Sequence, residues 1–208
     1  MDSGGAARMG AGFADIWAWR HPRPHRVDGY CIGRTDVALD PRRARRLARR
    51  IQRAARLHGL PREVWTSPLR RCADVGRWLK RWGWTHHIDA ALLEMDFGRW
   101  DGQPWSAIAH AEIEAWNREI AHYAPGGGEA FSALLARAAR WAHAARWRGD
   151  GVVIVVAHAG WMRARRWLED SSEAPAQYDA LPAAPSYGAL WKLKKLDLPP
   201  PAPTDGIL

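Results

Sequence analysis

The sequence predicts a layered α/β domain with a mostly parallel sheet. Short runs of β-branched and aromatic residues alternate with longer segments in which apolar residues recur every three or four positions. A hydrophobic fraction of 47% and a charged fraction of 25% are typical of globular proteins and exclude a disordered chain. The length of 208 residues suits one domain, or one domain with a small insertion.

The first half of the chain supplies three expected strands, at residues 15–19, 63–66 and 85–88. A helix is expected from Asp40-Pro41, because aspartate caps free N–H groups and proline suits the first helical position; Gly59 ends it. Its expected core positions are Ala44, Leu47, Ala48, Ile51, Ala55 and His58. Ser67-Pro68 repeats the start signal for a helix to about residue 82.

The second half contains the clearest strand. Residues 151–157 form a β-branched run typical of a central strand buried on both faces, and residues 187–196 are expected to add an edge strand. Residues 105–147 hold two segments of helical spacing, separated by the Pro-Gly-Gly-Gly at 125–128. Because these two helices lie between sheet elements, we expect them to form a cap over the site.

Residues 14–197 are expected to form this single domain between flexible ends. Residues 1–13 are rich in small residues and residues 198–208 read LPPPAPTDGIL, so both bury too little apolar surface to fold alone. No apolar stretch approaches the length of a membrane span, and no leader pattern is present. Cys31 and Cys72 suit neither a disulfide framework nor a zinc site. We expect a cytoplasmic protein with no membrane partner.

Three segments place polar groups at one edge of the predicted sheet. His21 and His158 each follow an expected strand, and ligands of open α/β sheets bind beyond the carboxyl ends of the strands. The third segment carries Arg71 at the start of a helix, where free N–H groups and the helix dipole favour anions. The sequence therefore predicts one anion site built from separated segments.

This set of residues suits phosphoryl transfer. A neutral imidazole can attack phosphorus, and arginines hold phosphate oxygens in a planar fork. Glu94 is a candidate proton donor to the leaving oxygen, and Asp96 competes with it for that role. Each residue taken singly also has a structural alternative: strand-end histidines are often only hydrogen-bonded, and helix arginines and loop carboxylates are often solvated.

The net charge of +9 admits two kinds of partner, a phosphorylated substrate or a nucleic acid. The helix expected at 41–56 carries eight arginines, and some of the 14 tryptophans could stack on bases. The arginines surround an apolar stripe, however, so a solvated helix face is the favoured interpretation. A nucleic-acid-binding protein is the alternative from another class, and steep salt dependence of nucleic-acid retention would identify it.

Five segments, in order, resemble motifs of the histidine phosphatase superfamily, which includes the cofactor-dependent phosphoglycerate mutases. Arg20-His21-Pro22 resembles the family's Arg-His-Gly. Residues 66–72 resemble its Ser-x-Leu-x-Arg-Ala segment, and residues 93–102 its Glu-x-x-x-Gly-x-x-x-Gly segment. Residues 125–129 and 156–160 complete the set. One triplet is weak evidence, whereas five in the expected order are a specific signal.

The resemblance implies a three-layer α/β/α sandwich with one mostly parallel, mixed sheet of six strands. It implies that His21 is the phosphorylated nucleophile and that Glu94 is the general acid. Arg20, Arg71 and His158 would form the phosphate pocket, with Ala159 beside them. It also implies an enzyme that needs neither metal nor cofactor.

Within the superfamily, residues 29–39 resemble a segment of the α-ribazole phosphatases, which act late in cobalamin synthesis. By this resemblance Arg34 is a further anion contact; the alternative is that Arg34 and Asp36 only organise a turn. The favoured function is thus a metal-independent phosphomonoesterase acting on α-ribazole 5′-phosphate. A broad sugar-phosphate phosphatase and a phosphoglycerate mutase-like enzyme are the alternatives within the class. The sequence is compatible with a monomer and with a homodimer.

Three departures from the family pattern bear on substrate choice. Pro22 stands where glycine is usual, which fixes the backbone φ and removes an N–H. Ala130 stands where the family has a serine after Gly128-Glu129. Residues 170–185 have no clear counterpart. No departure removes a proposed catalytic group. Pro22 nevertheless leaves one alternative, in which the protein is a catalytically inactive relative that binds a phosphorylated ligand.

Overall fold

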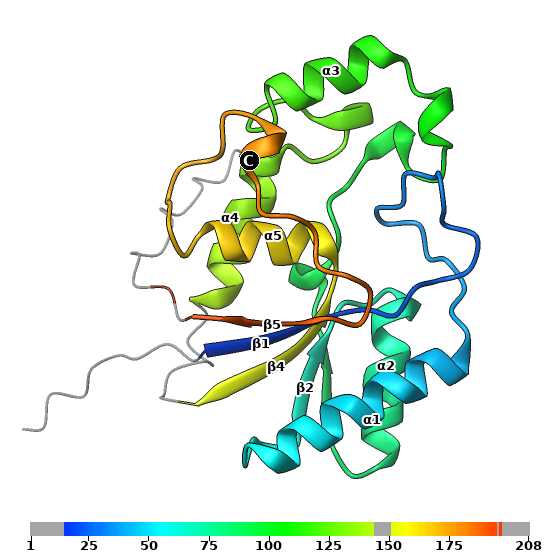
Figure 1. Cartoon of the computed structure of the whole chain (residues 1–208), viewed down its shortest axis with the longest axis vertical. Coiled ribbons are helices and arrows are strands. Elements are labelled where there is room, and N and C mark those ends of the chain that lie inside the picture. The colour runs from blue at the N-terminus through cyan, green and yellow to red at the C-terminus, as the bar shows by residue number, and fades with distance from the viewer. Residues whose placement is uncertain (1–14, 144–150, 195, 197–208) are drawn as a thin grey trace, which may run out of the picture.

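A five-stranded sheet forms the centre of the protein (Figure 1). The computed structural model describes residues 15–143, 151–194 and 196. The sheet has the order β3-β2-β4-β1-β5 and consists of β1 (Asp15–Arg20), β2 (Glu63–Thr66), β3 (Thr85–Ile88), β4 (Val152–Ala157) and β5 (Leu190–Leu193). The first four are parallel, and β5 pairs antiparallel with β1 at the edge. The predicted α/β class with a mostly parallel sheet is confirmed.

The sheet of the described residues has five strands, not the six that the family resemblance implied. Each of the five was expected from the chain itself. The long connection before β5 forms a short 3₁₀ turn at Tyr178–Ala180 and otherwise no regular structure. It contains Pro175, Pro182 and Pro185, which have no N–H to donate to a strand ladder, so this stretch is poorly suited to adding a sixth strand.

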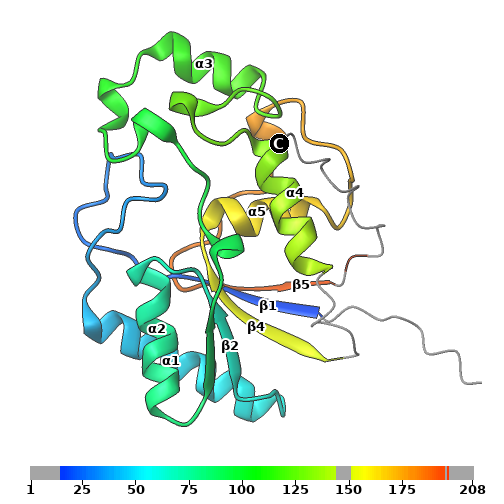
Figure 2. The ribbon, with the colours of Figure 1, turned by 180° about the vertical axis from the view of Figure 1, so that it is seen from behind.

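Helices cover both faces of the sheet and give three layers (Figure 2). The helices are α1 (Pro41–Leu57), α2 (Arg70–Arg81), α3 (His110–Arg118), α4 (Phe131–Ala142) and α5 (Ala159–Trp167). Successive side chains of a strand point to opposite faces. Trp19 and Val156 accordingly pack toward α1 and α2, whereas Ala18 and Val155 pack toward α4 and α5.

α1 begins where the sequence predicts. The Asp40 carboxylate accepts a hydrogen bond from the Arg42 N–H at 2.8 Å, and Pro41 occupies the first turn. The buried residues are the expected Ala44, Leu47, Ala48, Ile51 and Ala55. His58 was wrongly expected in the core: it is exposed, because it caps the helix just before Gly59 turns the chain at a φ of 62°.

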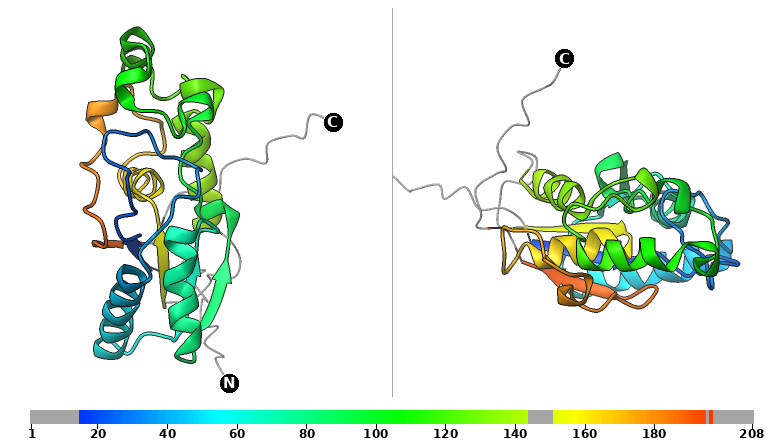
Figure 3. Two further views of the ribbon diagram at one scale, coloured as in Figure 1. Left: turned by 90° about the vertical axis from the view of Figure 1, so that its right-hand side faces the viewer. Right: turned by 90° about the horizontal axis from the view of Figure 1, so that it is seen from above.

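α3 lies apart from the sheet, at one end of the long axis of a flattened molecule (Figure 3). Of the two helices expected to form a cap, α4 instead joins the layer beside α5. Its Trp141 ring lies 5.5 Å from the Trp161 ring of α5 and 6.4 Å from the Trp65 ring of β2. The end of the expected cap segment, 144–147, lies outside the described residues. No helix of the described ranges is long and apolar enough to span a membrane.

Candidate functional site

The parallel register of β1 and β4 brings two histidines together. Arg20 lies opposite Ala157, so the next residues along, His21 and His158, leave the sheet side by side. Their ring centroids are 5.1 Å apart. Both side chains are buried. The structure thus joins two residues that are far apart in the sequence, at the sheet edge where ligands of α/β proteins bind.

A single backbone contact fixes which nitrogen of His21 is free. Its Nδ1 lies 2.8 Å from the carbonyl oxygen of Pro22, which can only accept, so Nδ1 carries the proton of the neutral ring and Nε2 carries a lone pair. Pro22 lacks an N–H but retains this carbonyl, so the departure from glycine leaves the contact intact. Burial, and then the charge of Arg71, hold the pKa of His21 well below its ordinary value. The ring is therefore neutral at neutral pH.

Arg71 extends from the first turn of α2 and is almost fully buried. Its Nε donates to Nδ1 of His158 at 3.2 Å, and Nη1 donates to the Thr35 carbonyl at 2.7 Å. Nη2 donates to the carbonyl of Gly33. These contacts hold the guanidinium in one orientation. Burial, together with the nearby charge of Arg71, lowers the pKa of His158, so His158 is neutral as well.

His158 lies behind the cavity and is fully buried. Because its Nδ1 accepts from Arg71, its proton is on Nε2, and that nitrogen lies 3.5 Å from the Cys72 Sγ. The described contacts therefore place His158 against Arg71 and His21, and none of them brings its Nε2 to the cavity.

Arg20 has an unsatisfied donor beside His21. Its Nη1 donates to the Pro185 carbonyl at 2.6 Å, and its Cζ lies 3.8 Å from the centroid of the Tyr187 ring. Its Nε is buried and has no hydrogen-bond partner among the described residues. Burial lowers the pKa of Arg20. A buried N–H without a partner is costly and is satisfied if an anion enters. No sequence pattern pointed to Tyr187, whose ring is also 5.5 Å from that of His21.

Glu94 reaches the same cavity, whereas its competitor Asp96 does not. The Glu94 carboxylate accepts from the Met95 N–H at 2.9 Å and from the Gly160 N–H at 3.1 Å. A Cβ at position 160 would lie 2.3 Å from Oε1 of Glu94, so glycine there leaves room for the carboxylate. Ala159 and Gly160 begin α5, and both line the cavity, at a helix N-terminus that favours anions.

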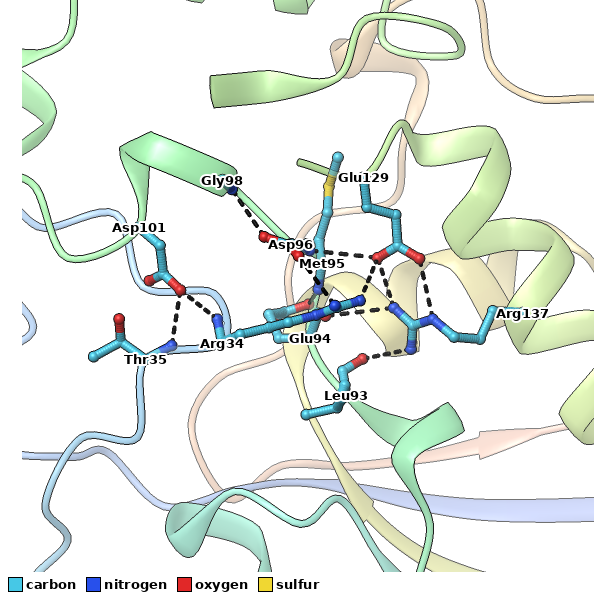
Figure 4. A network of polar contacts seen from close by, with 10 residues as sticks. All are labelled: Arg34, Thr35, Leu93, Glu94, Met95, Asp96, Gly98, Asp101, Glu129 and Arg137. Atoms are coloured by element: carbon cyan, nitrogen blue, oxygen red, sulfur yellow. Dashed lines mark hydrogen bonds and ion pairs between the residues drawn. The ribbon is translucent and has the colours of Figure 1, made fainter. Parts of the chain in front are cut away.

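Arg34 does not line the cavity. Its guanidinium forms ion pairs with Asp96 at 3.0 Å and with Glu129 at 3.6 Å (Figure 4). Its own backbone N–H is held by the carboxylate of Asp101, which also accepts from the N–H of Thr35. The structure therefore places the Arg34 guanidinium against two carboxylates and outside the lining of this cavity.

The cavity has an anion end and an apolar remainder, with a volume of about 250 Å³. Arg20, His21, Arg71 and Glu94 line the anion end. The remaining walls are mostly aromatic and aliphatic, among them Tyr30, Ile32, Phe97, Trp105, Trp116 and Phe131. Arg163 is the one further charged residue among the described lining residues; it donates to the Pro182 carbonyl at 2.8 Å and to the Tyr178 hydroxyl at 2.6 Å.

Acidification is expected to destabilise the protein through its buried histidines. Because the pKa values of His21 and His158 are lowered on folding, the unfolded chain binds more protons just below the ordinary value of 6.5. The contribution of these two histidines to the free energy of unfolding should be constant above about pH 7 and fall below it, by up to about 1.4 kcal/mol per pH unit for each histidine. Urea unfolding from about pH 7.5 to about pH 5.5 measures this slope.

The variant His158→Gln isolates the effect of one histidine. It should give a shallower slope than the wild type, whereas His122→Gln, at an exposed position, should keep the wild-type slope. Equal slopes for His158→Gln and the wild type would contradict the expectation.

The chain is similar to a known family and to several solved structures. A family model described as the histidine phosphatase superfamily, branch 1, matches residues 16–184. A mycobacterial glucosyl-3-phosphoglycerate phosphatase, solved in a complex with VO3, has a TM-score of 0.67 and 25% identity over 85% of this chain and 88% of that chain. A second structure, named mycobacterial hydrolase 1, has a TM-score of 0.62 and 27% identity over 78% of this chain and 82% of that chain.

Bacillus stearothermophilus YhfR shares the fold, with a TM-score of 0.67 and 21% identity over 85% of this chain and 89% of that chain. No protein of curated function matches the chain. The family model covers most of the described residues, including all five segments that resembled its motifs. The chain therefore belongs to branch 1 of the histidine phosphatase superfamily, whose phosphatases and phosphoglycerate mutase-like enzymes act on phosphorylated substrates.

Proposed function

We propose that the protein is a metal-independent phosphomonoesterase that works through a phosphohistidine formed on His21. The observation that carries this proposal is the buried, neutral His21, whose Nδ1–H is held by the Pro22 carbonyl so that Nε2 is the free nitrogen. Beside it stand Arg20 and Arg71, two cations that no carboxylate within 4 Å neutralises among the described residues. A phosphate monoester supplies both the electrophile and the missing counter-charge.

The proposed reaction has two displacements. In the first, Nε2 of His21 attacks phosphorus, the ester P–O bond breaks, and protonated Glu94 gives its proton to the leaving oxygen. In the second, water gives a proton to Glu94 and attacks phosphorus, and the P–N bond breaks. Phosphate leaves, neutral His21 is restored and Glu94 is again protonated.

The cations and the helix end have distinct proposed roles. Arg20 offers its free Nε–H to the phosphoryl oxygens, and Arg71 offers the remaining N–H groups of its oriented fork. The backbone N–H of Ala159, in the first turn of α5, adds a dipolar donor. His158 holds Arg71 through Nδ1, so we propose that it acts mainly by orienting that arginine.

The leaving group faces apolar walls, which supports α-ribazole 5′-phosphate as the favoured substrate. The flat benzimidazole of that ester matches aromatic surface, and Arg163 offers a donor to its ribose oxygens. Tyr30 and Ile32 belong to the segment that resembles α-ribazole phosphatases, and both line the cavity. A sugar-phosphate phosphatase is the second candidate: a glucosyl-3-phosphoglycerate phosphatase is among the similar structures, and Arg163 also suits a carboxylate.

Phosphate release from a panel of esters tests the proposal. The panel contains α-ribazole 5′-phosphate, glucosyl-3-phosphoglycerate, glucose 6-phosphate and 3-phosphoglycerate, each with EDTA and with His21→Ala as the control. We expect His21-dependent release, fastest from the ribazole ester. Faster release from glucosyl-3-phosphoglycerate would overturn the proposed substrate and support the proposed reaction. Inhibition by EDTA, or no release from any ester, would overturn the reaction itself.

A further inference from the structure

Four charged side chains form a continuous series of ion pairs beside the backbone of Glu94 (Figure 4). We name it the acid clamp; it consists of Arg34, Asp96, Glu129 and Arg137. Arg137 donates two hydrogen bonds to the Glu129 carboxylate, at 3.1 Å from Nε and 2.7 Å from Nη2. Arg34 joins Asp96 to Glu129. Two cations and two anions balance, so the clamp needs no counter-ion from a substrate.

The clamp also binds the backbone on both sides of Glu94. Nη1 of Arg137 donates to the carbonyls of Ala91 at 3.0 Å and Leu93 at 2.8 Å, and its Nη2 reaches the Glu94 carbonyl at 3.4 Å. On the other side, Oε2 of Glu129 accepts from the Asp96 N–H at 3.4 Å. Only 14% of the Arg137 side chain and 12% of the Glu129 side chain are exposed, so solvent screens these contacts little.

Glycines let Glu129 approach this closely. A Cβ at Gly128 would lie 2.2 Å from the Asp96 carbonyl, and one at Gly126 would lie 2.3 Å from the Phe97 carbonyl. The Glu129 N–H then donates to the Asp96 carbonyl at 2.8 Å. The glycine-rich segment before Glu129 therefore serves a packing need: it lays one loop on the backbone that carries Glu94.

We propose that Arg137 is a positioning residue for proton transfer by Glu94. The inference rests on the proposed function, in which Glu94 protonates the leaving oxygen. A proton donor must lie within hydrogen-bond reach of that oxygen, and a displacement of about 1 Å can cost roughly a hundredfold in rate. Among the described residues, the hydrogen bonds to the Glu94 carboxylate come from two backbone amides, those of Met95 and Gly160. Its reach is therefore set by the backbone that Arg137 holds.

The test uses Arg137→Lys, which keeps the charge but has one nitrogen where the guanidinium uses three. Arg140→Lys, at an exposed position of the same helix, is the matched control. We measure kcat and KM on glycerol 1-phosphate, whose leaving alkoxide needs a proton, and on 4-nitrophenyl phosphate, whose leaving phenolate does not. Arg137→Lys should lower kcat/KM on the alkyl ester about 10- to 100-fold and change kcat/KM on the aryl ester less than about threefold, because kcat/KM reports the first displacement, in which only the alkoxide needs the proton.

A double-mutant cycle separates positioning from general damage. If Arg137 acts through Glu94, Arg137→Lys should cause no further loss of alkyl-ester turnover in a Glu94→Gln background. Equal losses on both esters, an unchanged alkyl rate, or additive losses in the cycle would each overturn the inference. Failure of the proposed function looks different, because the wild type would then release phosphate from neither ester. Thermal unfolding shows whether each variant is folded.

Discussion

Replacing His21 with asparagine is expected to lower kcat at least about a thousandfold while the fold persists. Asparagine retains an N–H that can donate to the Pro22 carbonyl, as Nδ1 does now at 2.8 Å, but it has no nitrogen in the place of Nε2. The substitution therefore removes the proposed nucleophile and keeps the hydrogen bond to the backbone. Steady-state phosphate release measures the loss, and the thermal unfolding temperature shows that the protein is folded.

The covalent intermediate gives an independent measurement of the same step. Rapid quenching of wild-type turnover with a ³²P-labelled ester should trap label on the protein that is lost in acid and retained in alkali, as expected for a P–N bond. His21→Asn should trap none. Label that survives acid would point to a hydroxyl nucleophile instead, and turnover by His21→Asn within tenfold of the wild type would remove His21 from the reaction.

Replacing Glu94 with glutamine should lower kcat/KM by a factor that depends on the leaving group. Glutamine has nearly the same shape but no acidic proton, so kcat/KM on an alkyl phosphate should fall about 10²- to 10⁴-fold. On 4-nitrophenyl phosphate, whose leaving group departs as a stable anion, the loss should be tenfold at most, by the same reasoning. A series of esters with graded leaving-group pKa values measures the difference as a slope. Equal losses along the series would exclude Glu94 as the acid.

Gly160→Ala perturbs Glu94 while the chain keeps the carboxyl group itself. Its Cβ would meet Oε1 of Glu94 at 2.3 Å, so the carboxylate must move. The alkyl esters should again lose more than the aryl esters, by a smaller factor than in Glu94→Gln. Since Gly160 lies at the start of α5 and alanine favours helices, loss of folding is not the expected cause.

The sheet and α1 were predictable because local signals and global packing agree, whereas α2 begins at Arg70, after the Ser67-Pro68 start that the sequence predicted. The β-branched run of β4 can be buried on both faces, and Asp40-Pro41 starts α1 as a cap and a first turn. The expectation of a sixth strand rested on the family resemblance alone. The place of α4 was not predictable, because its apolar spacing shows that one face is buried without showing which surface covers that face. In the structure, Trp141 of α4 packs against β2 and α5.

The same distinction applies to the site. His21, Arg71 and Glu94 converge because strand ends and helix starts meet at one sheet edge, a rule that sequence positions can express. Arg34 differs, because its role depends on which carboxylates lie within 4 Å of it, and Asp96 and Glu129 come from separate segments. Arg137 had no local signal at all: an arginine on a helix is ordinary until its contacts are known.

The contact between His21 and the Pro22 carbonyl bears on how relatives of this protein are found. The His21 ring contacts the backbone carbonyl oxygen of residue 22, which every amino acid carries; this contact requires neither an N–H at residue 22 nor the lack of a side chain there. The residue after the histidine is thus free to vary wherever its backbone can place that oxygen. A search pattern that demands Arg-His-Gly overlooks such chains, whereas one written as Arg-His followed by any residue, with the later Glu and His-x-Gly segments, retains them.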